Sequence, residues 1–164
     1  MYLAEALAAR KDALTEIDGL RERIVAAAAH YEDDEIEQNE DATSLLARLT
    51  ELLDRLENLN VRINRTNNAA VLTFEGRAYS LMAAIALRDR LLLEQRVRKA
   101  VVEGLNEALG HGRRSYERRT KDEVRRISSL RPAQVHAAAD AVAARIRLLD
   151  LAMQHVNWST DLLD

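Results

Sequence analysis

The chain has 164 residues, a formal net charge of −3 at pH 7 and no cysteine. This length suits one domain with a sizeable core, and the small net charge predicts binding to neither nucleic acids nor acidic membranes. The absence of cysteine excludes a disulfide framework, thiol catalysis and thiolate metal sites, and it fits a cytosolic protein. Charged residues make up 31% and apolar residues 48%, with one proline and five glycines. Such a composition favours long helices over a β-sandwich.

The first predicted helix runs from about Leu3 to Tyr31, and its N-terminal residues lack the basic-then-apolar pattern of a secretion signal. Its apolar side chains recur at spacings of three and four, which places them on one face. They are Leu3, Leu7, Leu14, Ile17, Leu20, Ile24, Ala28 and Tyr31. The segment 32–41, EDDEIEQNED, has seven acidic residues in ten, which predicts a solvated acidic loop.

The second predicted helix carries the most regular pattern of the chain. Steps of three and four continue without a break, as is typical of the seam of an antiparallel helix pair or bundle. The seam residues are Ala42, Leu45, Leu49, Leu52, Leu56, Leu59, Ile63, Thr66 and Ala70. One flank of this seam consists of Leu46, Leu53, Asn60 and Asn67. This flank is therefore apolar for two heptads and carries amides for the next two.

Residues 71–79 break the helical pattern, because β-branched and aromatic residues flank Glu75-Gly76. This predicts a β-hairpin, with a simple inter-helix loop as the alternative. A third helix is predicted from about Ser80 to Leu109. Its apolar face is broader than one seam, which predicts a second buried surface and hence a homo-oligomer. The face comprises Leu81, Met82, Ile85, Leu87, Leu91, Leu92, Leu93, Val97, Val101 and Leu105.

A basic connection, 110–131, leads to Pro132, which suits the first turn of a fourth helix. An unbroken seam then follows: Val135, Ala139, Val142, Ile146, Leu149, Met153 and Val156. The most apolar uncharged run, Ala78–Leu87, is too short for a membrane span, which needs about 20 residues. The predicted fold is thus mainly α: an elongated antiparallel four-helix bundle, with a small hairpin between helices 2 and 3, in a single domain over 1–164.

A cluster of amides is the first candidate site. Asn60, Asn64 and Asn67 are neighbours on one helix, and an antiparallel up-and-down layout brings the end of the fourth helix beside them. The cluster residues at the end of the fourth helix are Asn157, Trp158, Ser159 and Thr160. Buried amides need partners, so we predict one polar cluster. Its main interpretation is a structural network that fixes helix register, and its alternatives are a small polar ligand site and an oligomer contact.

The basic segment 113–126 is the second candidate, because its cations can contact phosphates. These are Arg113, Arg114, Arg118, Arg119, Lys121, Arg125 and Arg126. We favour the alternative that the segment pairs with the acidic loop at the same end of the bundle, so nucleic acid is not the expected partner. The four histidines, His30, His111, His136 and His155, lack the spacing of a metal site, and no catalytic motif is present.

Four segments of the chain are distinctive: YLAEALAARKD at 2–12, VRINRTNNA at 61–69, EGRAYSLMAAIALRD at 75–89 and VNWSTDL at 156–162. On these segments the chain resembles a family of small bacterial proteins of unknown function whose members are often labelled septicolysin-like. The resemblance covers nearly the whole chain, matches poorly around Tyr116 and implies no catalytic residues. The label implies a cytolysin, but the lack of a secretion signal and of a membrane-length apolar run argues against a literal interpretation.

These observations predict a non-enzymatic, cytosolic, oligomeric scaffold or interaction protein that holds no metal or cofactor. The alternatives are nucleic-acid binding through the basic segment and a small-ligand or enzyme site at the amide cluster. The sequence does not name a protein partner.

Overall fold

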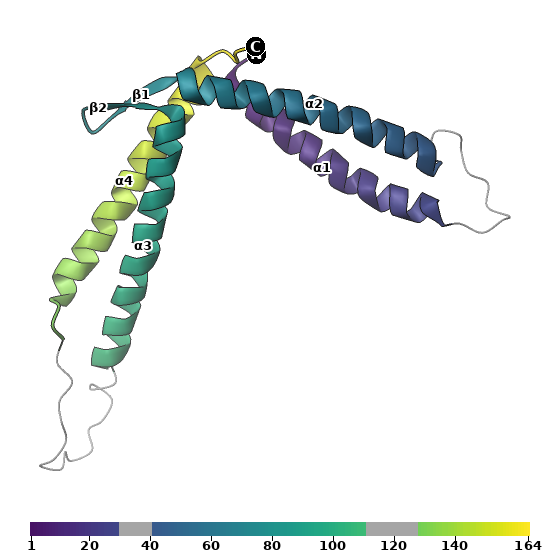
Figure 1. Ribbon diagram of the computed structural model, residues 1–164. Coiled ribbons are helices and arrows are strands. Elements are labelled where there is room, and N and C mark those ends of the chain that lie inside the picture. Colours follow the sequence, from purple (N-terminus) through teal and green to yellow (C-terminus); the bar gives the residue numbers. More distant parts are fainter. Residues whose placement is uncertain (30–40, 111–127) are drawn as a thin grey trace, which may run out of the picture. The chain divides into compact units, whose positions relative to one another are not determined.

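The computed structural model describes residues 1–29, 41–110 and 128–164, and it contains four helices and one β-hairpin (Figure 1). The elements are α1 (Leu3–Ala28), α2 (Ala42–Ala69), β1 (Val71–Phe74), β2 (Arg77–Ser80), α3 (Leu81–Gly110) and α4 (Pro132–Ser159). The predicted fold class is confirmed, with the antiparallel hairpin between the second and third helices.

The chain divides into two compact units. The first consists of Met1–Met82 together with Met153–Asp164, and the second consists of Ala83–Ala152. The assignment of the whole chain to one domain stays a prediction.

In the first unit, α1 and α2 lie side by side and antiparallel (Figure 1). Leu20 of α1 and Leu45 of α2 are almost completely buried, as the seams predict. An ion pair between Arg48 and Glu16, at 2.6 Å, joins the two helices at their surface. The three-four spacing of both helices thus produces the pairing that the sequence predicts, because each presents one apolar face to the other.

The start of α2 is fixed by Asp41, the last residue of the acidic segment. Its Oδ1 accepts hydrogen bonds from the backbone N–H groups of Thr43 (2.9 Å) and Ser44 (3.0 Å). These are donors of the first helical turn that have no partner within the helix. The Ser44 hydroxyl adds a third hydrogen bond, to Oδ2, at 2.6 Å. Chiefly because of the bonds from Ser44, the pKa of the Asp41 carboxyl lies below its ordinary value.

The hairpin follows α2 directly and turns at Glu75-Gly76. Both residues have positive φ angles, 50° and 74°, as the two central residues of a type I′ turn require. The register pairs Val71 with Ser80 and continues to the turn. Leu72 and Phe74 are buried while Val71 is exposed, so the strand buries alternate side chains.

In the second unit, α3 and α4 lie side by side (Figure 1). Leu91 of α3 and Leu149 of α4 are fully buried, and an ion pair between Arg88 and Asp150 links the two helices. The seam predicted for the fourth helix therefore faces the core at Leu149.

Two details of the first predicted helix differ from the structure. Leu14, predicted on its buried face, is half-exposed, because a helix that packs against one partner buries only a narrow strip and Leu14 lies at the edge of it. The helix also ends at Ala28, and the backbone of Ala29 is extended, whereas Tyr31 lies outside the described residues.

Candidate interaction surfaces

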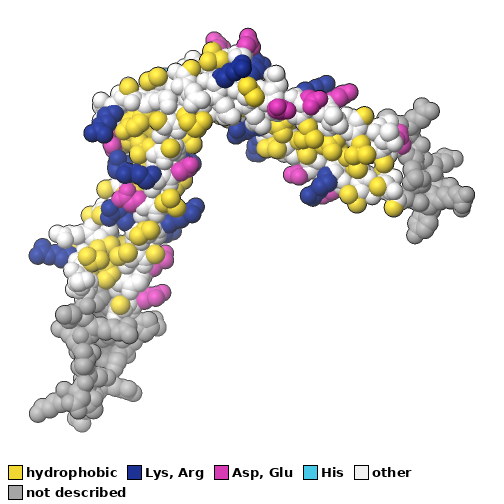
Figure 2. Space-filling model, viewed as in Figure 1, with side chains coloured by type: hydrophobic (Ala, Val, Ile, Leu, Met, Phe, Trp, Pro, Cys, Tyr) yellow, Lys and Arg dark blue, Asp and Glu magenta, His cyan; other side chains and the backbone are white. Residues whose placement is uncertain are grey.

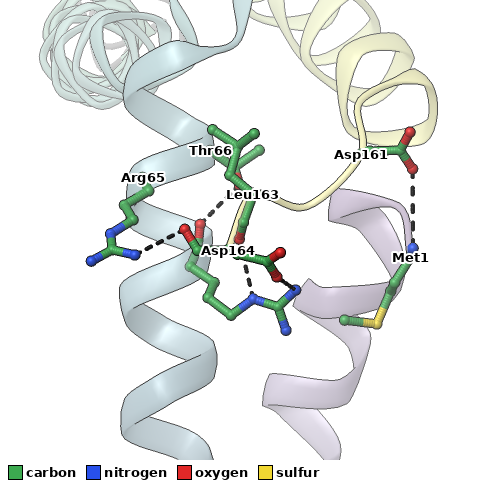
Figure 3. Close-up of polar contacts among 7 residues, drawn as sticks. Met1, Arg65, Thr66, Asp161, Leu163 and Asp164 are labelled. Carbon is green, nitrogen blue, oxygen red and sulfur yellow. Dashed lines mark hydrogen bonds and ion pairs between the residues drawn. The ribbon is translucent and has the colours of Figure 1, made fainter.

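Three segments distant in sequence meet in what we call the terminal clasp, made of residues 1–3, 62–66 and 160–164 (Figure 3). The backbone N–H of Leu3 donates to the carbonyl of Thr160, and that of Leu162 donates to the carbonyl of Met1, both at 2.9 Å. Tyr2 and Asp161 form an isolated antiparallel bridge between these bonds. The segment after α4 is thereby held against the start of α1.

Thr66 ties the end of α2 into this clasp. Its side chain is fully buried, and its hydroxyl donates to the carbonyl of Arg62 at 2.8 Å. The same oxygen accepts a hydrogen bond from the backbone N–H of Leu163 at 3.0 Å (Figure 3). The buried hydroxyl thus acts as both donor and acceptor, which avoids the free-energy cost of a buried polar group without a hydrogen bond.

Two arginines of α2 hold the last residues of the tail. Arg62 donates through Nε to the carbonyl of Leu163 (3.1 Å) and through Nη2 to the carboxylate of Asp164 (2.8 Å). Arg65 donates to a main-chain oxygen of Asp164 at 2.8 Å. Because the Asp164 side chain is fully exposed, its ion pair contributes little by itself. The guanidinium groups serve mainly to orient the tail.

The structure brings the end of α2 and the segment after α4 together, but through backbone groups, Thr66 and the two arginines. Within the described residues no hydrogen bond joins the three predicted amides of α2 to Asn157 or Trp158. Asn67 is buried, Asn60 is half-buried and Asn64 is exposed.

The residues predicted at the end of α4 differ in their surroundings. Trp158 is 63% exposed, and the carboxamide oxygen of Asn157 is buried and has no hydrogen-bond partner among the described residues. Ser159 donates to the carbonyl of His155 (2.8 Å), and Thr160 takes part in the clasp through its backbone. A site role for these residues stays a prediction.

The second predicted site lies outside the described residues. All seven cations of the basic segment 113–126, and all of the acidic loop except Asp41, fall in the ranges 111–127 and 30–40. Nucleic-acid binding and the pairing of the two segments therefore both stay predictions.

The flank of α2 formed by Leu46, Leu53, Asn60 and Asn67, which we call the α2 stripe, has an unexpected distribution of burial. Its leucines are 50% and 46% exposed, whereas Asn67 is 7% exposed. Figure 2 shows hydrophobic side chains gathered along the visible side of α1 and α2. The apolar half of the stripe is thus the half that the chain leaves uncovered, against the usual order of burial.

A second uncovered apolar surface lies between α3 and α4, and we call it the α3–α4 groove. It is a hollow of about 680 Å³. Its apolar lining consists of Leu93, Val97, Val101, Leu130, Val135 and Ala138, and its polar lining of Arg90, Glu94, Arg98, Arg131 and Gln134. Leu93 and Val97 are 59% and 65% exposed. The broad apolar face predicted for the third helix is therefore present, because Leu91 faces the core and Leu93 lies outside it.

The rim of the groove carries an excess of positive charge. Glu94 accepts hydrogen bonds from Arg98 at 2.6 Å and 2.9 Å. The hydrogen bonds from Arg98, with smaller contributions from the charges of Arg98, Arg90 and Arg145, lower the pKa of the Glu94 carboxyl. Among the described residues Arg90 and Arg131 form no ion pair. With three arginines and one glutamate, the rim therefore carries a net positive charge.

Sequence reasoning missed the clasp, although one signal was present. A threonine on an otherwise apolar seam, Thr66, marks a point where the core contains a hydrogen bond. The tail residues Leu163 and Asp164 carry no comparable signal, because their partners lie about a hundred residues away and no local pattern encodes them.

The sequence profile of a family of unknown function, DUF6847, matches residues 10–162. The chain belongs to this family. It is also similar to the crystal structure of a functionally unknown conserved protein from Corynebacterium diphtheriae, with a TM-score of 0.79 and 29% sequence identity over 99% of each chain. No curated protein matches the chain. Within the ranges that the structure describes, no helix of the chain combines the length and apolar character needed to cross a membrane.

Proposed function

We propose that this DUF6847 protein is a non-enzymatic interaction protein that self-associates through the α2 stripe. The half-exposure of Leu46 and Leu53 carries the proposal. Burying a leucine side chain completely contributes about 1.5–3 kcal/mol. Because Leu46 and Leu53 are each about half-exposed, a partner that covers both would add a stabilisation of the same order. A pair of helices with apolar residues beyond its own seam is typical of a component of a larger bundle.

The polar groups of the terminal clasp support a structural role for that region. Thr66, Arg62 and Arg65 are all bonded to the chain's own backbone or to Asp164, so they serve the fold. The proposal includes a cytoplasmic location, which the absence of cysteine supports. It retains the septicolysin-like resemblance as a family likeness without lytic activity.

Light scattering of the purified protein at micromolar concentration tests the proposal. We expect the wild type to exceed the 18.5 kDa of one chain, and the double variant Leu46→Gln/Leu53→Gln to shift toward that mass. The matched control is Val71→Gln, which changes another exposed apolar side chain, on the hairpin, and should leave the mass as in the wild type. A wild type found only at 18.5 kDa contradicts the proposal.

A further inference from the structure

We propose that the α3–α4 groove of one copy receives the α2 stripe of a second copy, so that the protein associates head to tail. This inference rests on the proposed self-association and specifies the surface that the stripe meets. Its physical basis is that one chain carries both an uncovered apolar ridge and an uncovered apolar hollow, with complementary charges beside them.

The two surfaces match in chemistry and length. Leu46 and Leu53 project from one face of α2, and Leu93 and Val97 line the groove with comparable exposure. The stretch from Leu46 to Glu57 and the stretch of α3 from Arg90 to Val101 each extend about 16 Å at 1.5 Å per residue. A helix laid in the groove would therefore cover its apolar lining from end to end, as amphipathic helices do in hydrophobic grooves.

The charges beside the stripe are acidic. Asp54 and Glu57 are exposed and form no ion pair among the described residues. They line a shallow hollow of about 570 Å³ together with Arg62 and Arg65, but those arginines are bonded to the tail. Glu57 follows Leu53 by one helical turn, so it lies on the same face.

The basic residues of this part of α2 are occupied elsewhere. Arg48 pairs with Glu16 at 2.6 Å, and Arg55 lies 3.9 Å from Glu51. Within the described residues, the stripe thus presents two acids that form no ion pair, whereas the groove rim presents Arg90 and Arg131, which form no ion pair either. Opposite charges at the edge of an apolar contact speed its formation and favour the correct partner.

Because stripe and groove are different surfaces, their contact joins unlike patches of two copies. Such a contact leaves one free stripe and one free groove on every pair, and it builds rings or open chains. An isologous dimer, in which stripe meets stripe, would stop at two copies. The head-to-tail contact and the isologous dimer therefore predict different results when a variant without the apolar stripe is mixed with a variant without the apolar groove.

The mixing experiment uses two full-length variants. Leu46→Gln/Leu53→Gln has no apolar stripe but an intact groove, and Leu93→Gln/Val97→Gln has an intact stripe but no apolar groove. All four side chains are about half-exposed or more, so both variants should fold, and circular dichroism melting checks this. We expect each variant alone to have the mass of one chain, and an equimolar mixture to form a pair of about twice 18.5 kDa and nothing larger.

The outcomes distinguish the two proposals. A wild type with the mass of one chain overturns both. A groove variant that assembles like the wild type overturns the head-to-tail contact and leaves self-association standing. A mixture that remains monomeric also overturns the head-to-tail contact, because an intact stripe and an intact groove have then failed to bind.

A charge-reversal series gives an independent measurement on exposed residues. Arg90→Glu/Arg131→Glu should weaken self-association at least about tenfold. Asp54→Arg/Glu57→Arg should do the same, and mixing the two variants should restore binding, both through the reversed groove with the reversed stripe and through the native groove with the native stripe that the two variants retain. Equal affinities for all combinations would overturn the charge complementarity on which the inference depends.

Discussion

Thr66 illustrates what one side chain decides in this protein. It occupies a seam position where the pattern predicts an apolar residue, and it is fully buried. Its hydroxyl is the acceptor for the backbone N–H of Leu163, so a single oxygen connects α2 to the tail. Thr66 therefore belongs to the core by packing and to the clasp by hydrogen bonding.

We predict that Thr66→Val, which keeps the shape and removes the hydroxyl, lowers the free energy of unfolding by about 1–3 kcal/mol. The reason is that the Leu163 N–H loses its acceptor in a partly buried position. Amide hydrogen exchange at Leu163 should accelerate in Thr66→Val, whereas Thr66→Ser, which retains the hydroxyl, should preserve protection there. Unchanged exchange in Thr66→Val would show that the bond does not hold the tail.

Gly76 is required by the backbone of the hairpin turn. Its φ is 74°, and an added Cβ would meet no atom within 4 Å, so the cost of a side chain is conformational and not steric. Gly76→Ala should therefore destabilise by about 1 kcal/mol. Gly19, in the interior of α1 and equally open, is the matched control: Gly19→Ala should stabilise by about 0.5–1 kcal/mol. Urea unfolding measures the change in unfolding free energy for both variants. Changes of the same sign would contradict the conformational explanation.

At the scale of the element, the start of α2 depends on a charged cap. The bonds from Ser44 and Thr43 lower the pKa of Asp41 in the folded state. A carboxyl whose folded pKa is below its unfolded pKa contributes stability above the unfolded value, about 3.9, and this contribution is lost as pH falls through the folded pKa. The cap should thus weaken in acid.

We predict that the difference in unfolding free energy between wild type and Asp41→Asn shrinks as pH falls from 6 toward 3. Asparagine still caps a helix but does not titrate, so the difference isolates the charge of Asp41, while other carboxylates affect both proteins alike. Urea unfolding at a series of pH values, at one protein concentration, gives the measurement. A difference that does not change with pH would rule out a charged cap.

The third helix shows what a wide apolar face means. The sequence predicts a second surface on it, and the structure separates the two: Leu91 packs in the core of the second unit, and Leu93 and Val97 line the groove. A single helix can contribute to two surfaces, because side chains two residues apart in sequence are rotated about 200° from each other around the helix axis.

At the scale of the whole molecule, each unit is built around one pair of helices. A pair buries one strip of each helix and leaves the remaining apolar residues to solvent, whereas a bundle of four encloses a core. The similarity to the Corynebacterium diphtheriae protein extends over 99% of both chains. A test of assembly in that protein would therefore examine a chain of similar fold.

The four helices, the hairpin and its turn can be predicted from local sequence, because each depends on neighbours within a few residues. Seams at spacings of three and four, Pro132 at a helix start and Glu75-Gly76 between strand-forming residues are all local signals. Burial along the α2 stripe was decided only in three dimensions, where Asn67 is covered and Leu46 is not. The terminal clasp was likewise decided by tertiary structure, because it joins Tyr2 to Asp161 and Thr66 to Leu163. Hydrogen bonds between residues so far apart leave no periodic trace in the chain, since any backbone N–H or carbonyl can form them once packing has brought the segments together.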